Sequence, residues 1–348
     1  MKIMSVKRVI SWVTLALVAL ILFLSRHELQ KAWMLLEQVN VYILVLIIPL
    51  MLLSFYAASE IMFSYLRAKG SIEKTHWTTR ARMALELNFV NHTLPSGGVS
   101  GISYMTWRLG KFGVSPGRAA SAQMVRYVAG FIATAIVIPF CVLLVTIDGS
   151  INRWIILVSS MIVLFMLAAI VGMVYLVSSR VRMQQFATWI SRSVNKLVRK
   201  LTRGRKRVVM HEGNVLKFFE EIHDDYLELQ RDRRVLIYPI VWGLVFTILD
   251  AMVFAVTFWA LGTPVNPAPI LIAYTLASLA GFIVVTPGGA GAYEAIMVAF
   301  LAVAGISSGT AIAGILLSRV IILIVTIAGG YLFYQRALSK YGKQRHPA

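Results

Sequence analysis

Charged residues and cysteine are both scarce in this sequence. Only 14% of its 348 residues are charged, whereas soluble domains average about 25%, and 58% are hydrophobic. A soluble globular domain is therefore excluded. The single cysteine, Cys141, has no second cysteine with which to pair, so a disulfide-stapled secreted scaffold is excluded as well.

The signatures of common catalytic sites are also absent. The sequence contains no Walker A loop, no His-Glu-x-x-His zinc motif and no nucleophile elbow. We therefore expect a protein that is not an enzyme and that needs no metal and no other cofactor. An intramembrane enzyme that uses Glu86 and His92 is the least supported alternative.

Long apolar runs are what the sequence has in abundance, with a mean hydropathy of +0.76. A membrane-spanning helix needs about 17 to 25 apolar residues. Six segments meet this requirement, at 9–25, 41–66, 118–147, 152–178, 236–262 and 311–334. Two more, 83–106 and 270–305, are interrupted by Pro and Gly, which predicts re-entrant helical hairpins. No small-x-small cleavage site follows the first segment, so we expect an uncleaved span.

The basic residues are distributed unevenly between the two sides of these spans. If the N-terminus is inside, the inner segments hold 29 of the 34 Lys and Arg residues, and the outer loops hold three. Inner loops of membrane proteins are enriched in Lys and Arg. The pattern predicts a membrane protein with cytoplasmic N- and C-termini. It also accounts for the net charge of +19 without a nucleic-acid partner.

The two interrupted segments begin a pattern that occurs twice. Each half has an acid in one span (Glu60, Asp250), then a Pro-Gly-Gly break, then an arginine in the next span (Arg126, Arg319). Each half has three crossings, an odd number, so the second copy is expected upside down relative to the first. The pattern predicts an all-α polytopic membrane protein with six spans and two re-entrant hairpins arranged as inverted repeats. The predicted parts are a first repeat (1–147), the first span of the second repeat (148–178), an insert (179–235), the rest of the second repeat (236–334) and a basic tail (335–348).

The insert contains two amphipathic stretches. Residues 180–207 combine an apolar stripe with many basic residues, which predicts a helix on the anionic lipids of the inner leaflet. Residues 215–229 are acidic and amphipathic, and either cap the first stretch or dock a partner such as a lipid-modifying enzyme. The alternative for both stretches is a passive anchor that only fixes the orientation of the spans in the membrane.

Several polar residues within the apolar segments are candidates for a ligand site. A charged side chain at a helix centre costs about 2.5–3.5 kcal/mol on insertion scales, so it needs a partner or a task. Guanidinium groups and the free amides of a half-helix N-terminus both bind phosphate. We expect a lipid headgroup to contact Arg126, Arg319, Pro95, Gly97, Gly98, Pro287, Gly288, Gly289, Tyr293 and Glu294. Charge partners or gating groups are expected at Glu60, Asp250, Glu86, Asn91 and His92, with internal salt bridges as the alternative.

These motifs resemble those of a known family. The stretch Thr286-Pro287-Gly288-Gly289-Ala290-Gly291-Ala292-Tyr293-Glu294 is similar to the Pro-Gly-Gly-x-Gly-x-x-Glu signature of the lysylphosphatidylglycerol synthase transmembrane, or flippase-like, family. Leu94 to Gly101 with Arg126 resembles the earlier motif of that family, and the likeness covers about residues 5–335. The family includes the membrane part of the bacterial multiple peptide resistance factor. This chain ends fourteen residues after Tyr334, so we expect no aminoacyl-transferase domain.

The resemblance implies a translocator of the bacterial inner (cytoplasmic) membrane that moves a phosphate-bearing lipid between leaflets. The substrate would be a phospholipid, aminoacylated or not, or a polyprenyl lipid. Arg126 would serve the cytoplasmic side and Arg319 the outer side, and Glu60 and Asp250 would pair with these arginines or with a cationic headgroup. The alternative is a membrane scaffold that binds lipid and presents it to a separate lipid-modifying enzyme.

Overall fold

The protein is an all-α polytopic membrane protein. The computed structural model describes residues 26–37, 39–94, 99–147, 152–201, 211–283 and 291–342, with Ala19 and Phe23 before them, and this part of the chain contains helices and no strand. Five long apolar helical segments can cross a membrane. They are α3–α4 (Val41–Val45 and Ile47–Ala68), α7 (Pro116–Ile147), α8 (Arg153–Val177), η1–α11 (Arg233–Leu236 and Ile237–Ala260) and α14 (Ser308–Tyr341).

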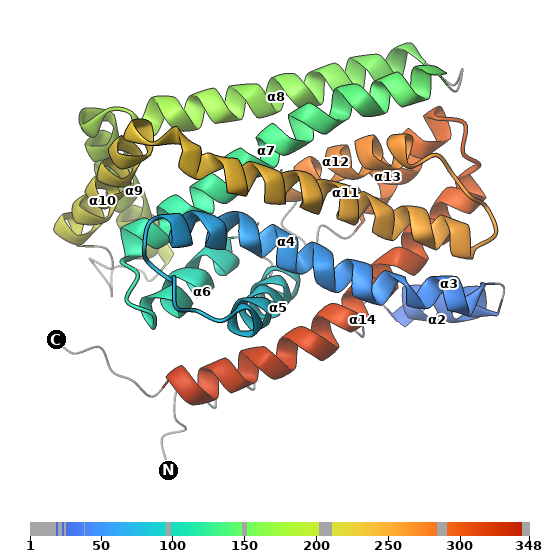
Figure 1. Cartoon of the computed structure of the whole chain (residues 1–348), viewed down its shortest axis with the longest axis horizontal. Helices are drawn as coiled ribbons and strands as arrows, with labels where there is room; N and C mark the ends of the chain where they lie inside the picture. The colour runs from blue at the N-terminus through green and yellow to red at the C-terminus, as the bar shows by residue number, and fades with distance from the viewer. Residues whose placement is uncertain are drawn as a thin grey trace.

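These segments confirm five of the six predicted spans, and the predicted span 9–25 lies outside the described residues apart from Ala19 and Phe23. The short helix α2 (Arg26–Leu36) precedes them and packs against α14. At 1.5 Å per residue, the 34 residues of α14 extend for about 50 Å, which exceeds the roughly 30 Å of a bilayer core. In Figure 1 this helix crosses the bundle diagonally.

The two interrupted segments form two pairs of short helices. The first pair is α5 (Trp77–Thr93) and α6 (Val99–Gly110), and the second is α12 (Pro267–Ile283) and α13 (Ala292–Val303). The helices of each pair pack against each other, as Figure 1 shows. Helix α5 begins six residues before the predicted boundary because His76 caps it, accepting a hydrogen bond from the backbone N–H of Thr78.

Packing between the two halves of the chain follows a reciprocal scheme. Helices α4 and α11, the acid-bearing spans, lie side by side in the centre (Figure 1). Helix α5 packs on α14 of the other half, and its counterpart α12 packs on α7. Each pair also has its own apolar core. Phe63, Phe89 and Met105 are buried around α5–α6, and Phe258, Ile272 and Met297 around α12–α13.

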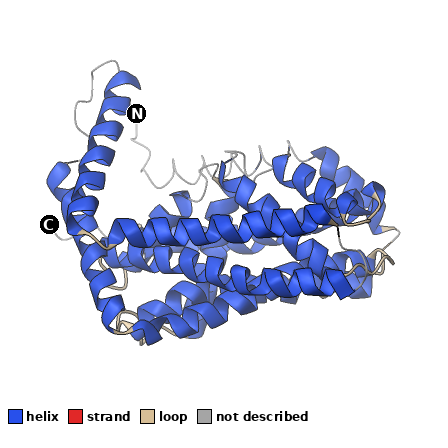
Figure 2. Cartoon of the chain, turned by 90° about the horizontal axis from the view of Figure 1, so that it is seen from above, coloured by secondary structure: helices blue, strands red, loops and turns tan. Residues whose placement is uncertain are grey.

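The insert forms α9 (Arg180–Leu201) and α10 (Glu212–Arg231), which pack on each other at one end of the bundle. Figure 2 shows them steeply inclined to the long spans. The acidic side chains of α10 bind the ends of α4 and α7: Asp225 accepts from the Tyr65 hydroxyl at 2.5 Å and pairs with Arg118 at 3.3 Å. The acidic stretch therefore caps both the first amphipathic helix and the bundle itself.

Candidate functional site

Arg319 lies at the centre of the most complete cluster of predicted site residues. Its Nε forms an ion pair with Oε1 of Glu294 at 2.9 Å, and its guanidinium carbon lies 4.6 Å from the ring centroid of Tyr293. The second carboxylate oxygen of Glu294 accepts from the backbone N–H of Gly291 at 2.6 Å. Gly291 has a φ of +90°, a conformation that other residues rarely adopt. Glu294 thus holds the arginine and caps α13 at the same time.

Polar contacts continue from this cluster through the middle of the bundle. The Tyr293 ring packs edge-on against Tyr274 of α12, with centroids 6.2 Å apart. The Tyr274 hydroxyl lies beside the carboxylate of Asp250 on α11, and Ser54 Oγ of α4 donates to Asp250 Oδ1 at 2.9 Å. A string of polar side chains therefore runs from α14 to α4. Asp250 pairs with neither arginine in the described part of the chain, contrary to one of the two expectations for it.

His92 brings the first helix pair into the same region. Its Nδ1 lies 2.9 Å from the carbonyl oxygen of Asn88 on the preceding turn of α5. The ring is close enough to Arg319 to interact with its charge. The packing of α5 on α14 thus places groups from both halves of the chain around one guanidinium.

Arg126 has a different environment from Arg319. The side chain is half-buried on α7, and no ion pair or hydrogen bond to it is formed by the residues that the structure describes. The reason is visible in the register of the two halves. Glu294 lies seven residues after Pro287, and the residue seven after Pro95 is Ile102. The first half therefore has an apolar residue at the position of the carboxylate that holds Arg319.

Two predicted acids take part in separate ion pairs. Glu60, with 1% of its side chain exposed, pairs with Arg67 at 2.7 Å and with Arg80 at 2.6 Å. The predicted pairing of Glu60 with Arg126 or Arg319 is therefore wrong in this structure. Arg67 and Arg80 had been counted among the loop charges, although Arg67 follows Glu60 by two helical turns and so lies on the same face.

Glu86 is buried within the first helix pair. It accepts from Arg108 Nε at 3.0 Å and from the Tyr104 hydroxyl at 2.8 Å. These contacts join α5 to α6 and match the alternative of an internal salt bridge for Glu86. Asn91 lies against Gly101 of α6, and its buried Oδ1 has no hydrogen-bond partner among the described residues.

The remaining predicted residues are those of the two breaks. Pro95, Gly97, Gly98, Pro287, Gly288 and Gly289 lie outside the described residues. The described residues include no group of three His, Cys, Asp or Glu arranged for a metal ion. The structure thus brings Arg319, Tyr293, Glu294 and His92 together, connects them to Asp250, and leaves Arg126, Glu60 and Glu86 apart.

Comparison with known proteins gives concordant matches. A 27% identical relative is a UPF0104 membrane protein of Methanothermobacter thermautotrophicus, aligned over 67% of this chain and 67% of its own length. A second UPF0104 membrane protein of that organism is 27% identical over 56% of this chain, which spans about half of that relative. The family described as the lysylphosphatidylglycerol synthase TM region matches residues 9–330. The chain therefore belongs to the lysylphosphatidylglycerol synthase transmembrane family.

Proposed function

We propose that this protein is a lipid translocator that moves a phosphate-bearing lipid between the two leaflets of its membrane. The main support for this proposal is the environment of Arg126. Its guanidinium is half-buried in a membrane span and has no carboxylate partner among the described residues. Such a group costs about 2.5–3.5 kcal/mol at a helix centre unless an anion compensates for it. A lipid phosphate is an anion that reaches this depth, and guanidinium binds it through two hydrogen bonds.

Arg319 is the proposed second phosphate ligand. Glu294 and Tyr293 hold its guanidinium in place, which lowers the entropy lost when a ligand binds. A phosphate would compete with Glu294 for the guanidinium. Asp250, which contacts hydroxyl groups rather than arginine, is suited to a cationic group on the same headgroup, such as an aminoacyl ammonium. The family name makes lysylphosphatidylglycerol one candidate ligand, beside other phospholipids and polyprenyl phosphates.

The reciprocal packing of the two halves supports an inverted repeat with two re-entrant hairpins. Equivalent helices make equivalent contacts, α5 with α14 and α12 with α7. In transporters with this plan the binding site lies near the midplane and opens to one side at a time. We propose cytoplasmic termini and an inner-membrane location, because 29 of the 34 Lys and Arg residues fall in the segments predicted to lie on one side of the spans. We also propose that no chemical reaction takes place and that no cofactor is used.

The exposed apolar face of α9 favours a second candidate, the lipid-presenting scaffold. Trp189 is 62% exposed and Val181 61% exposed on this helix, which lies at the end of the bundle. Large exposed apolar side chains at such a position suit either the membrane surface or a partner protein. A lipid-modifying enzyme that docks on α9 would fit this reading.

Lipid transfer in proteoliposomes distinguishes the two candidates. Vesicles would carry a fluorescent phospholipid, and a membrane-impermeant reductant would report how much of it reaches the outer leaflet. We expect transfer by the wild type, loss in Arg126→Gln, partial recovery in Arg126→Lys, and wild-type transfer in the control Arg153→Gln, an exposed arginine at the start of α8. Full transfer by Arg126→Gln would overturn the proposed role of Arg126. No transfer by the wild type, with a lipid enzyme co-purifying, would favour the scaffold.

A further inference from the structure

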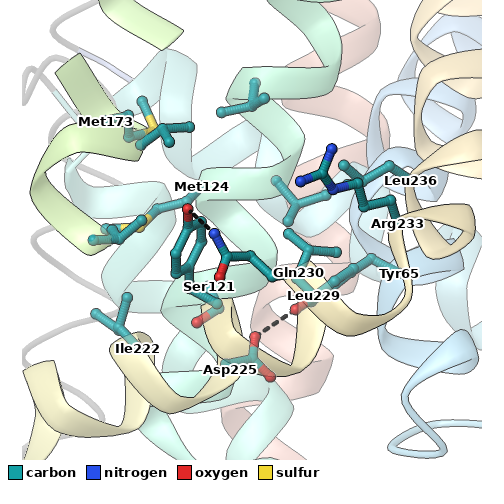
Figure 3. A pocket seen from close by; sticks show the side chains of 15 residues that line it. Tyr65, Ser121, Met124, Met173, Ile222, Asp225, Leu229, Gln230, Arg233 and Leu236 are labelled. Atoms are coloured by element: carbon teal, nitrogen blue, oxygen red, sulfur yellow. Dashed lines mark hydrogen bonds between the residues drawn. The ribbon is translucent and has the colours of Figure 1, made fainter. Parts of the chain in front are cut away.

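A cavity lies at the end of the bundle that carries α10, lined by none of the residues around Arg319. This cavity of about 350 Å³, here called the α7–α10 groove, is formed by α7, α8, α10 and η1–α11 (Figure 3). Its walls are mainly apolar. The apolar lining residues are Met124, Val125, Val128, Met173, Val174, Val177, Ile222, Leu229 and Leu236. In Figure 3, Met173 marks the wall made by α8, and Arg233 lies on the other side.

Most polar side chains of the groove bind other groups of the protein, and Ser121 Oγ is buried without a hydrogen-bond partner among the described residues. Asp225 binds the Tyr65 hydroxyl with one carboxylate oxygen and Arg118 with the other. Gln230 Nε2 donates to the Tyr226 hydroxyl at 2.7 Å, as the dashed line in Figure 3 marks. Arg233, which is exposed, forms no ion pair with the residues that the structure describes. The groove therefore offers an apolar interior and one available cationic group.

The lining of the groove favours a hydrocarbon chain, because nine of the fifteen residues that form its walls are apolar. The groove reaches the outer surface of α8 at Val174, which lines it and is 41% exposed, so that a chain can enter sideways from the bilayer. The apolar lining and this lateral access both favour a lipid.

We propose that the α7–α10 groove binds one acyl chain of an anionic phospholipid, whose phosphate contacts Arg233. The headgroup is expected to be anionic because Arg231 and Arg234 flank the same turn and add positive charge. A lipid bound here would contact α10 and the spans α7 and α8 at once, and so would attach the insert to the membrane part. The site does not depend on lipid translocation, and it persists if transfer between leaflets is absent.

The test uses the full-length protein in nanodiscs that contain a phosphatidylglycerol with a photoactivatable acyl chain. We expect peptides of α8 and α10, around Met173 and Ile222, to be labelled. The variant Met173→Trp fills the groove and should abolish labelling of α10, whereas the control Leu164→Trp, on the lipid-facing surface of α8, should not. Labelling confined to lipid-facing residues in the wild type, or unchanged α10 labelling in Met173→Trp, would overturn the proposal.

The headgroup contact has its own test. Native mass spectrometry measures how much phosphatidylglycerol and phosphatidylcholine the purified protein retains. One arginine near a membrane surface contributes about 1 kcal/mol, so Arg233→Gln should lower phosphatidylglycerol retention about fivefold and leave phosphatidylcholine unchanged. The matched control is Arg153→Gln, an exposed arginine at the opposite end of α8 from the groove. Equal retention by wild type and Arg233→Gln would overturn the role of Arg233, and unchanged thermal unfolding of each variant verifies that the fold is intact.

Discussion

Arg319 and Glu294 form an ion pair with 2.9 Å between Nε and Oε1, across the contact of α14 with α13. The same carboxylate closes the first turn of α13 by accepting from the backbone of Gly291. The position of the arginine is thereby tied to the start of the helix that follows the Pro-Gly-Gly break. A ligand that attracts Arg319 away from Glu294 would also act on that helix start.

Glu294 variants should separate its two contacts. Glu294→Ala removes both the cap and the ion pair, and a helix cap contributes about 1 kcal/mol. Glu294→Gln retains an oxygen that can accept from Gly291 but loses the charge that holds Arg319. We expect Glu294→Ala to lower the free energy of unfolding more than Glu294→Gln does, as measured in mixed micelles of increasing sodium dodecyl sulfate. Equal losses would indicate that the ion pair alone contributes.

Glu60 should be among the most important acids for stability. Its buried carboxylate binds two arginines, and the loss of one member of a buried pair costs about 3 to 5 kcal/mol because the partner charge is left uncompensated. We expect Glu60→Ala to unfold at much lower denaturant than the wild type. Glu73→Ala, at an exposed acid in the loop that follows α4, is the control and should behave as the wild type does. A wild-type unfolding curve for Glu60→Ala would refute this prediction.

Two adjacent glycines of α14 should respond oppositely to alanine. A Cβ on Gly330 would collide with Phe89 and the carbonyl oxygen of Leu85 on α5, whereas a Cβ on Gly329 would meet Leu85 at an ordinary 3.9 Å. We expect Gly330→Ala to lower the free energy of unfolding by about 1 to 3 kcal/mol through overpacking. Gly329→Ala should be neutral or stabilising by up to about 1 kcal/mol, because alanine favours helix. Similar unfolding curves for both variants would mean that α5 and α14 do not approach closely here.

The attachment of α10 to the bundle should depend on Asp225. This buried carboxylate accepts hydrogen bonds from Tyr65 and Arg118, and Asp225→Asn removes the charge that pairs with Arg118. We expect faster hydrogen–deuterium exchange throughout α10 in Asp225→Asn. Asp224→Asn changes an exposed neighbour of the same size and charge, so exchange should be as slow as in the wild type. Unchanged exchange in Asp225→Asn would argue against this anchor.

Acidification should weaken the same attachment through Glu228. A hydrogen bond from Lys69 lowers the pKa of the Glu228 carboxyl below its ordinary value, with Arg118 adding to the effect. A group whose pKa is lowered by folding stabilises the fold above its unfolded pKa, and this contribution disappears as the pH falls through the folded pKa. Wild type should therefore be more stable than Glu228→Gln at pH 7, and the difference should vanish once the pH falls below the lowered pKa of Glu228. A difference that grows on acidification would contradict the assignment. Because Glu228 is half exposed, we expect the effect to be small.

Much of the architecture was predictable because hydropathy and charge are local properties. Four of the five spans match their predicted ranges within three residues. The fifth, α14, continues seven residues beyond its predicted end. The two Pro-Gly-Gly motifs correctly marked where apolar segments divide into pairs of short helices. The sequence also predicted that Arg319, Tyr293 and Glu294 belong to one site. Tyr293 and Glu294 lie in the first turn of α13, and Arg319 lies on α14, the next helix along the chain.

The sequence by itself determined the helical membrane class, the places where the helices break and the presence of charged groups inside the spans. Only the tertiary structure decided which of those charges meet. Arg319 has a carboxylate partner, and Arg126 has none among the described residues. Glu60 forms ion pairs with Arg67 and Arg80. The physical reason is that an ion pair between helices depends on their relative rotation and register. Local composition sets neither, since both follow from how α5 packs on α14 and α12 on α7.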